Sequence, residues 1–301
     1  MTEQRTADVT GPVDPPRPAV IEAVGRALAE DVLPLGDLTA SLVGSEVTGT
    51  VAMVARQPGV IAGRRCAEET FNQVDPELEV TWHRSDGAEV CADAVVATVT
   101  GRLQSILTAE RTALNFLCHL SGVATLTRRF VDAARTVNPT TRILDSRKTT
   151  PGLRSLEKAA VRAGGGTNHR GNLSEAVLIK DNHLGGVSIG DAVSRARALW
   201  PGRMVEVECD RADQVTEAVA ARATVIMLDN MTPDQIAHCV GLVRDSATAI
   251  LVEVSGGVTL ETVPAYAATG VDLISVGALT HSAPILDLAF DLVPGPVRSG
   301  Q

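Results

Sequence analysis

Aromatic residues are scarce in this sequence of 301 residues, which contains four Phe, two Trp and one Tyr. So few rings cannot supply the stacking platforms to which single-stranded nucleic acids bind. The net charge of -9 also opposes binding to phosphate backbones, so the composition argues against a nucleic-acid partner. Long apolar runs are missing as well, because segments such as VVATV and TVIML fall far short of the roughly 18 residues of a membrane helix. No membrane segment is predicted.

The amino terminus lacks the basic start and the apolar stretch of a signal peptide. Its first 20 residues contain acids and four prolines, which predicts a disordered tail over residues 1–18 of a cytoplasmic protein. The five cysteines are an odd number and include no CxxC pair that could hold a metal or shuttle electrons. Buried thiols in a reducing compartment are predicted instead.

Lysine is nearly absent, since 24 of the 27 basic residues are Arg. The three lysines, Lys148, Lys158 and Lys180, nevertheless lie within 33 residues of one another. Residues 142–180 hold eight Lys or Arg against three Asp or Glu, a local balance of +5. A positive segment in an acidic protein suits a small polyanionic substrate, although composition alone favours a solvated charged face.

The first part of the chain, residues 19–117, is predicted to be an α+β domain. Period-two runs between Thr50 and Val99, broken by Gly and Pro, indicate a small antiparallel sheet. Helical spacing covers residues 21–33, and a long helical stretch runs from about Leu107 to Arg135 with a pause at Ser121-Gly122.

Residues 118–282 have a different rhythm, in which short and almost wholly apolar strands alternate with amphipathic helices. This pattern is typical of parallel strands buried on both faces. Without a GxGxxG or GxxxxGK[ST] turn, it favours a β/α barrel over a nucleotide-binding doubly wound sheet. The predicted strands lie in ILDSRKT, AVLIKDNH, MVEVECD, TVIMLDN, AILVEVSGG and LISVGALT.

Each predicted strand ends in polar or glycine residues. Because the carboxyl ends of barrel strands meet on one face, we expect these residues to form one pocket. They are Arg147, Lys148, Lys180, Glu208, Asp229, Ser255, Gly256, Gly257 and Gly277.

The pocket predicts three ligands: a dianion, a metal and a phosphate. Guanidinium forks clamp carboxylates at two points, and ammonium groups act as point charges. Glu208 and Asp229 suit Mg²⁺ held through carboxylates and water. Glycines at the last strand ends often expose backbone N–H groups to a phosphate. The cations are Arg147, Lys148, Arg170 and Lys180, together with His169.

Each of these features also has a structural explanation. Arg147 could pair with Asp145. Glu208 could pair with Arg211, and Ser-Gly-Gly is a common turn. Lys158 lies in a helical segment and is predicted to be a surface residue. The histidines without metal-ligand spacing are interpreted as structural, namely His83, His119, His238 and His281.

Several long strings occur in a fixed order: GDLTA, ERTALNFLCHLSGVAT, DSRKTTPGLR, LEKAAVRAGGGTNHR, AVLIKDNH, VEVE, MLDN, EVSGGV and ISVGALTHS. In this order and spacing they resemble the quinolinate phosphoribosyltransferases over about residues 19–293. The resemblance implies an incomplete β/α barrel, with residues 283–301 returning to the N-terminal domain. It also implies a pentosyltransferase of NAD biosynthesis, which converts quinolinate and 5-phosphoribosyl-1-pyrophosphate to nicotinate mononucleotide, pyrophosphate and CO₂, with Mg²⁺.

The family's motifs imply a role for each matched residue. The substrate-binding residues would be Arg147, His169, Arg170 and Lys180 for the quinolinate carboxylates, and Ser255, Gly256 and Gly277 for the 5-phosphate. Lys148 would lie near the pyrophosphate, and Glu208 and Asp229 would serve the metal and the ribose. With Lys180, these three form the implied catalytic set. Arg111 would reach into the site of the partner subunit, so the implied active unit is a homodimer.

The chain departs from the family's usual residues at Ser146, at Ala163 and in the string GNLSE after Arg170, where MGLSD is more usual. Asn172 replaces a glycine and Glu175 replaces an aspartate in the loop after Arg170. Ser146 stands where Thr is usual, and Ala163 stands where Cys is frequent. Because the charged positions are retained, we expect these changes to affect loop geometry more than chemistry.

Other classes of function are open from the residues alone. Lys180 at a strand end also suits a Schiff-base aldolase, although the surrounding cations suit carboxylates better than a neutral carbonyl. A non-enzymatic module that binds a phosphorylated metabolite would leave Glu208 and Asp229 unexplained. A phosphoribosyltransferase for nicotinate or another pyridine would need no clamp for two carboxylates.

Overall fold

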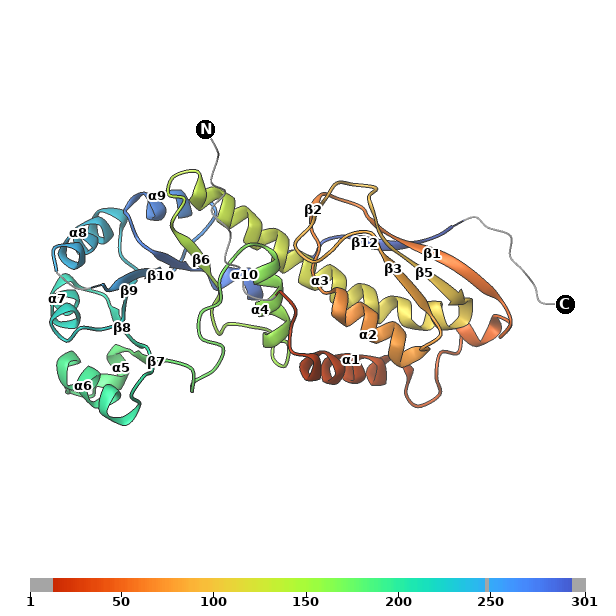
Figure 1. Cartoon of the computed structure of the whole chain (residues 1–301), viewed down its shortest axis with the longest axis horizontal. Helices are drawn as coiled ribbons and strands as arrows, with labels where there is room; N and C mark the ends of the chain where they lie inside the picture. The colour runs from red at the N-terminus through yellow and green to blue at the C-terminus, as the bar shows by residue number, and fades with distance from the viewer. Residues whose placement is uncertain (1–12, 247–248, 294–301) are drawn as a thin grey trace, which may run out of the picture. The chain divides into compact units, whose positions relative to one another are not determined.

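A computed structural model of the chain describes residues 13–246 and 249–293. The chain forms two compact units (Figure 1). Unit 1 comprises Met1–Leu126, Thr150–Gly165 and Ser282–Gln301, and unit 2 comprises Thr127–Thr149 and Gly166–His281. Over the described ranges, every helix is too short or too polar to cross a bilayer.

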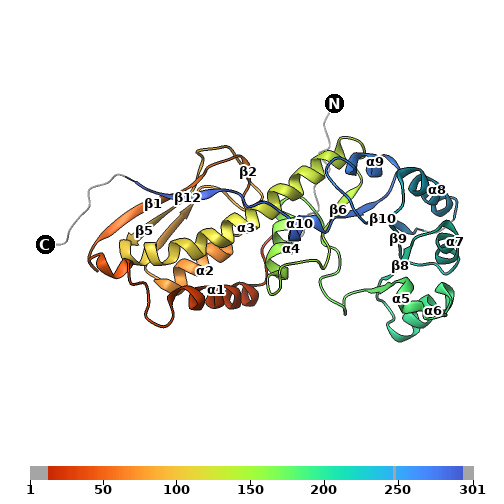
Figure 2. The same cartoon turned by 180° about the vertical axis from the view of Figure 1, so that it is seen from behind.

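An antiparallel sheet with strand order β12-β1-β5-β3 is the centre of unit 1. Its strands are β1 (Thr48–Ala55), β3 (Glu79–Trp82), β5 (Val95–Arg102) and β12 (Leu288–Leu292), and a second ladder pairs β2 (Gly59–Val60) with β4 (Glu89–Val90). The predicted antiparallel sheet is therefore observed. β12 joins it from the far end of the chain and lies beside β1 (Figure 2). The register runs from Val51 opposite Leu292 to Ala55 opposite Leu288.

Helices pack against this sheet around an apolar core that includes Met53, Phe71 and Leu117. The helices of the unit are α1 (Arg17–Val32), α2 (Arg64–Val74), α3 (Leu103–Arg135, which continues into unit 2), α4 (Arg154–Ala163) and the short 3₁₀ helix η1 (Ala40–Leu42). The interpretation of residues 50–99 as strand-like throughout is wrong at α2. That helix buries Cys66, Ala67, Thr70 and Phe71, a helical spacing that charged residues interrupt in the sequence.

The long helix α3 does not pause at Ser121-Gly122, contrary to the prediction. A Cβ atom on Gly122 would lie 2.1 Å from the carbonyl oxygen of Pro284, so glycine there permits a close approach of two backbones. The hydroxyl of Ser121 accepts a hydrogen bond from the amide of Ala62 and is fully buried. Both residues therefore serve packing rather than helix termination.

Helix α4 has a buried charged face, which corrects the prediction that Lys158 is a surface residue. Lys158 is 6% exposed and Glu157 is fully buried. Glu157 accepts a hydrogen bond from the amide of Thr150 at 3.1 Å, and its other oxygen lies 2.8 Å from His119 Nε2. His119 thus contacts a buried carboxylate of the fold, which agrees with its interpretation as a structural histidine.

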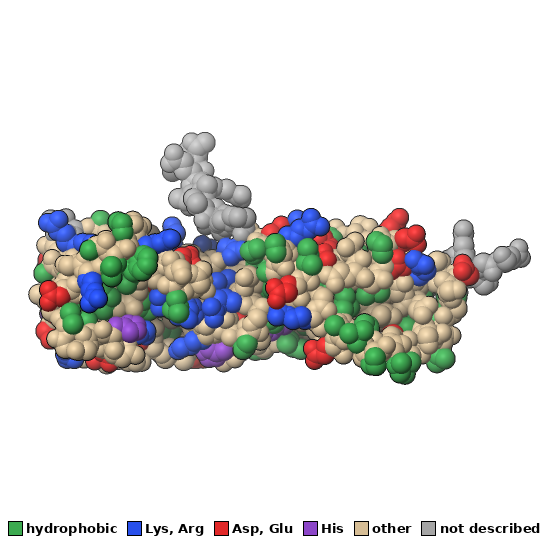
Figure 3. All heavy atoms as spheres, turned by 90° about the horizontal axis from the view of Figure 1, so that it is seen from below, with side chains coloured by type: hydrophobic (Ala, Val, Ile, Leu, Met, Phe, Trp, Pro, Cys, Tyr) green, Lys and Arg blue, Asp and Glu red, His purple; other side chains and the backbone are tan. Residues whose placement is uncertain are grey.

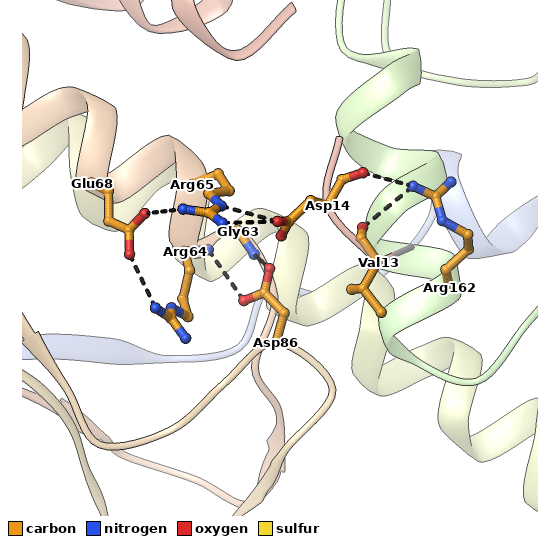
Figure 4. A network of polar contacts seen from close by, with 8 residues as sticks. All are labelled: Val13, Asp14, Gly63, Arg64, Arg65, Glu68, Asp86 and Arg162. Atoms are coloured by element: carbon orange, nitrogen blue, oxygen red, sulfur yellow. Dashed lines mark hydrogen bonds and ion pairs between the residues drawn. The ribbon is translucent and has the colours of Figure 1, made fainter. Parts of the chain in front are cut away.

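Residues 1–12 of the predicted tail lie outside the described part of the chain. The residues that follow are tied to unit 1 (Figure 4). Arg65 donates to the carboxylate of Asp14 at 3.0 Å, and Arg162 donates to the backbone carbonyls of Val13 and Asp14. Helix α1 begins shortly afterwards, at Arg17.

All five cysteines are free. Cys66, Cys209 and Cys239 are buried as predicted, whereas Cys118 is partly buried and Cys91 is exposed, contrary to the prediction. Burial raises the pKa of the Cys66 and Cys209 thiols to about 12, so these two are unreactive as nucleophiles.

Unit 2 contains a six-stranded parallel sheet with strand order β6-β11-β10-β9-β8-β7. The strands are β6 (Arg142–Leu144), β7 (Val177–Ile179), β8 (Val205–Cys209), β9 (Val225–Asp229), β10 (Leu251–Ser255) and β11 (Leu273–Ser275). The helices that follow them are α5 (Asp181–Leu184), α6 (Ile189–Leu199), α7 (Ala212–Ala220), α8 (Pro233–Arg244), α9 (Val263–Ala268) and α10 (Ala278–His281). All six predicted strands are confirmed. In the described ranges β6 and β7 remain edge strands, so the barrel is incomplete, as expected.

Candidate active site

The carboxyl ends of the parallel strands in unit 2 surround a cavity of about 510 Å³. The structure therefore brings together most of the residues that the strand-end argument selected. Those that line the cavity are Arg147, Lys148, His169, Arg170, Lys180, Glu208, Asp229, Ser255, Gly256 and Gly257.

Two predicted site residues lie outside this lining. Gly277 follows β11, and a Cβ atom there would lie 3.0 Å from Lys148 Cδ and 3.2 Å from His281 Nε2. Glycine at this position thus lets the two side chains pack closely at the edge of the site. Arg111 lies on α3 in unit 1, where its side chain is exposed.

The alternation of side chains along each strand explains why these residues meet. On β8, Glu206 contacts His169 and Glu208 lines the cavity, so these alternate residues point to the same face of the sheet, while Val207 between them points to the other face and is buried. On β10, Leu251 and Glu253 line a second cavity of about 360 Å³, and Ser255 lines the first. The two cavities share His169 and Arg170, so a polar layer separates the apolar amino-terminal ends of the strands from the site.

The segment that carries His169 is fixed to the end of β6 by Asp145, which is fully buried. Asp145 accepts one hydrogen bond from the backbone amide of His169 at 2.9 Å and another from Asn168 Nδ2 at 2.6 Å. Thr167 also forms a bridge with Leu144 beside β6. Asp145 therefore fixes the backbone of the segment that carries two predicted substrate-binding residues, His169 and Arg170.

Positive charge is concentrated around Arg170. Burial lowers the pKa of the Arg170 guanidinium below its ordinary value, Arg147 lowers it further, and Glu206 opposes the change. Arg170 Nη1 donates to the carbonyl oxygen of Ala176 at 3.0 Å, which orients the fork. Two guanidinium groups that repel each other in a part-buried site favour a bound anion.

The two carboxylates at neighbouring strand ends have different partners. Glu208 Oε2 lies 2.5 Å from Lys180 Nζ, and Asp229 accepts a hydrogen bond from Asn230 Nδ2 at 2.6 Å. The alternative pairing of Glu208 with Arg211 is not observed, because Arg211 contacts Asp210 and Asp213 instead. Glu208 is thus held inside the cavity.

Gly256 closes the site next to Asn230. Its φ of +96° is a conformation that suits glycine, and a Cβ atom would lie 2.3 Å from Asn230 Oδ1 and 2.9 Å from its backbone nitrogen. The two strand-end turns therefore pack in direct contact, with backbone exposed between them.

Beneath the cavity, two glutamates on β8 and β10 flank His169. His169 Nε2 lies 3.0 Å from Glu206 Oε2 and 3.7 Å from Glu253 Oε2, and both glutamates are nearly inaccessible to solvent. Burial, and then the charge of Glu206, raise the pKa of Glu253 to about 8. The sequence analysis missed this pair. The strings VEVE and LVEVS could have indicated it, because each places an acid within an apolar strand. Burying an acid there lowers the stability of the fold unless the acid has a partner.

The altered loop after Arg170 is stabilised by the residues that distinguish it. Glu175 accepts a hydrogen bond from the amide of Gly171 at 2.6 Å, and Asn172 accepts one from the amide of Ser174 at 2.9 Å. Both substitutions thus supply acceptors for the loop's own backbone.

Unit 1 contains a cavity of similar volume, about 510 Å³. Three of its charged residues are engaged by one another, because Arg65 pairs with Asp14 and Glu68. The cavity of unit 2 differs in presenting an excess of cations.

An incomplete β/α barrel with cations, two carboxylates and glycines at its strand ends defines an enzyme site for a phosphorylated, anionic substrate. Residues 37–121 match the N-terminal domain of quinolinate phosphoribosyl transferase, and residues 123–291 match its C-terminal domain. The chain belongs to the quinolinate phosphoribosyltransferase family.

Similar proteins come from distant organisms. The chain is 44% identical over 282 residues to a carboxylating nicotinate-nucleotide pyrophosphorylase of Mycobacterium leprae, covering 91% of this chain and 97% of that one. It is 44% identical over 268 residues to a probable enzyme of the same name from Synechocystis, covering 88% and 90%. The solved nicotinate-nucleotide pyrophosphorylase from Francisella tularensis superposes with a TM-score of 0.88 at 39% identity, covering 96% of this chain and all of that one.

Proposed function

We propose that this protein transfers the phosphoribosyl group of 5-phosphoribosyl-1-pyrophosphate to quinolinate with loss of CO₂, giving nicotinate mononucleotide and pyrophosphate for NAD biosynthesis. The observation that carries the proposal is the single cavity that holds clustered cations beside Glu208, Asp229 and Gly256. A diacid, a ribose and a phosphate each find complementary groups there.

The cations would bind the aromatic diacid. Arg147, His169 and Arg170 all line the cavity, and charge-assisted hydrogen bonds from them would neutralise two carboxylates. Lys180 would complete this clamp while its contact with Glu208 holds it in place. A pyridine with one carboxylate would leave part of this charge unpaired, which favours quinolinate over nicotinate.

The strand ends that carry the small residues and the two acids would bind the phosphoribosyl donor. Ser255, Gly256 and Gly277 would hold the 5-phosphate through hydroxyl and backbone groups. Departure of pyrophosphate builds positive charge on the sugar, so Glu208 and Asp229 would stabilise the ribose as Lys148 binds the leaving group.

The two carboxylates also fit Mg²⁺. Glu208 and Asp229 end adjacent parallel strands and line the same cavity, and both present the oxygen ligands that Mg²⁺ prefers. The ion would neutralise the charge that develops on the pyrophosphate.

We expect decarboxylation to follow glycosylation. Attack by the ring nitrogen on the sugar makes a pyridinium, whose positive charge stabilises the carbanion formed when the adjacent carboxylate leaves as CO₂. No side chain would act as a covalent nucleophile, because positioning and electrostatics suffice. Release of CO₂ in the absence of the phosphoribosyl donor, or a trapped covalent enzyme adduct, would contradict this order.

The decisive experiment measures nicotinate mononucleotide and CO₂ from purified protein, donor, Mg²⁺ and quinolinate, with nicotinate as the control substrate. Stoichiometric formation of both products from quinolinate alone is expected. Equal turnover of nicotinate would indicate another pyridine as substrate. The aldolase alternative is not favoured by the family match, and failure of borohydride to trap a carbonyl substrate on Lys180 would exclude it.

Replacing Glu208 with Gln tests the acidic side of the site. We expect a large fall in kcat and a changed dependence on Mg²⁺, with quinolinate affinity changed little, because the carboxylate serves the donor and the metal. Isothermal titration with quinolinate and steady-state kinetics over a range of Mg²⁺ concentrations separate the two effects. Asp229→Asn should behave in the same way, and equal losses of affinity and turnover in both variants would indicate a structural role.

A homodimer is proposed as the active unit, with Arg111 reaching the partner's site. Unit 1 exposes hydrophobic side chains (Figure 3). Four leucines in and after the turn following α1 are at least 65% exposed, namely Leu33, Leu35, Leu38 and Leu42. Such a patch is typical of an interface between subunits. Light scattering tests the assembly, and mixing an Arg111→Ala chain with a Glu208→Gln chain should restore activity only if the sites are shared. The protein is expected to be cytoplasmic.

A further inference from the structure

The buried glutamates on β8 and β10 have no role in the proposed reaction so far. Branched apolar side chains normally fill the interior of a β/α barrel. Glu206 and Glu253 take such positions and are 0% and 1% exposed. One oxygen of each, Oε1, is buried without a hydrogen-bond partner in the described structure. Two carboxyl groups at this depth cost stability, so their retention needs an explanation.

Both carboxyl groups face the same ring nitrogen. His169 Nε2 lies 3.0 Å from Glu206 and 3.7 Å from Glu253, and the His169 side chain is 9% exposed. A carboxylate can only accept, so Nε2 must carry a hydrogen to bond with Glu206 in its ionised form. Glu206 and Glu253 are close enough to share a single negative charge if Glu253 keeps its proton. The raised pKa of Glu253 agrees with this arrangement.

The opposite end of His169 belongs to the site. Its backbone amide is held by Asp145, and its ring contributes to both the upper and the lower cavity. Two anchors, one on the backbone and one on Nε2, therefore fix where the ring lies relative to the neighbouring Arg170.

We propose that Glu206 and Glu253 are positioning residues, which fix the ring of His169 through the hydrogen on Nε2, so that the ring, when it also carries a hydrogen on Nδ1, donates that second hydrogen to a carboxylate of the pyridine diacid. This inference rests on the proposed function for the identity of the ligand. The presence of a hydrogen on Nε2 of His169 does not depend on that function. Glu206 supplies the negative charge, and Glu253 supplies a neutral hydrogen-bonding neighbour.

Kinetics of conservative variants test the inference. Glu206→Gln keeps the volume but removes the charge, and we expect the KM for quinolinate to rise by about ten- to a hundredfold, the effect of losing a charged hydrogen-bond partner. The kcat and the KM for the phosphoribosyl donor should change less than about threefold. Glu253→Gln should retain most of the affinity for quinolinate, whereas Glu253→Ala should lose about as much as Glu206→Gln.

Asp272→Asn is the matched control. Asp272 is an acid of the same unit that accepts hydrogen bonds from Arg244 and from the amide of Val252, and it is not among the residues that line either cavity. Its loss should lower the melting temperature and leave the KM for quinolinate unchanged. If Glu206→Gln and Asp272→Asn have the same kinetic constants, the glutamates are merely structural and the proposal is wrong.

A spectroscopic measurement on the free protein separates this inference from the proposed function. In a two-bond ¹H–¹⁵N spectrum, Nε2 of His169 should carry hydrogen in the wild type and lose that preference in Glu206→Gln. A bare Nε2 in the wild type would overturn the proposal even if quinolinate is the substrate. So would one tightly bound transition-metal ion per chain that is lost in Glu253→Gln, because the three groups would then be metal ligands. If quinolinate is not converted, the proposed function fails and the spectrum still decides the state of the ring.

Discussion

Two buried carboxyl groups, one in each unit, have opposite environments. Asp75 in unit 1 accepts hydrogen bonds from Arg102 and from the hydroxyl of Ser105, and the Arg102 guanidinium is the main cause that lowers its pKa to about 2. Glu253 in unit 2 lies beside Glu206, and burial together with that second acid raises its pKa to about 8. The surroundings of Asp75 therefore favour its ionised form. The surroundings of Glu253 favour its protonated form, and its burial costs stability.

The arginines of the two units differ in the same way. Asp75 and Glu77 raise the pKa of Arg102 above its ordinary value, so its charge is satisfied within unit 1. Burial and Arg147 lower the pKa of Arg170. Arg102 is therefore paired with acids in unit 1, whereas in unit 2 Arg170 lies near a second guanidinium, an arrangement that a bound anion would stabilise. This contrast distinguishes a structural ion pair from a ligand site better than the number of charges does.

The largest expected effect is on the cations of unit 2. Arg170→Ala should weaken quinolinate binding by ~2 to 5 kcal/mol, the range for truncating one partner of a buried charge pair. Isothermal titration measures the change directly. Arg102→Ala is the control from unit 1, and it should lower the melting temperature without changing quinolinate affinity. An unchanged dissociation constant for Arg170→Ala would break the comparison.

The ion pair of unit 1 should affect stability alone. Asp75→Asn is expected to lower the free energy of unfolding by about 2 kcal/mol at pH 7, the value of a hydrogen bond to a charged group. Because the pKa of Asp75 is lowered in the folded state, this stabilisation is present above its ordinary value of 3.8 and is lost as the pH falls towards 2. Urea unfolding at pH 3 to 7 should show the two proteins converging at low pH.

Glu77→Gln is the control for this variant. Glu77 contacts the same guanidinium, but its side chain is 79% exposed, so water screens the interaction and we expect a change well below that of Asp75→Asn. A loss as large as that of Asp75→Asn would show that the exposed contact, and not the buried one, stabilises unit 1.

The architecture of unit 2 was predictable because its strands are continuous apolar runs that end in polar residues. Lys180, Glu208 and Asp229 lie more than 20 residues apart in sequence, yet a parallel sheet places their strand ends together. The strand pattern was therefore enough to predict which side chains share a cavity. It gave no signal for the roles of individual residues, which remain predictions.

Features that depend on contacts between distant segments could not be predicted. Gly122 suggested a break in the long helix because glycine is a poor helix former, but the approach of Pro284 that requires it comes from 162 residues later in the chain. Glu253 likewise looked like an ordinary strand residue, because its partner Glu206 is on another strand. Arg111 has no local feature that separates it from other exposed arginines of a helix.

The last prediction is for Glu253→Gln, and it concerns how stability changes with pH rather than its size at one pH. A carboxyl whose pKa is raised on folding binds its proton in the folded state at pH values where the unfolded chain has released it. Between its ordinary value of 4.5 and about 8, the stability of the wild type should therefore fall as the pH rises, by at most about 1.4 kcal/mol per pH unit for one proton. Glutamine mimics the protonated form, so the variant should show a flatter profile over this range.

Asp75→Asn should instead change the profile only below about pH 4, so the two variants alter stability with opposite sign and in separate pH ranges. Denaturant unfolding at pH 5, 6.5 and 8 measures the slopes, and parallel profiles for Glu253→Gln and the wild type would mean that Glu253 is ionised at neutral pH and that the contrast between the two acids does not exist.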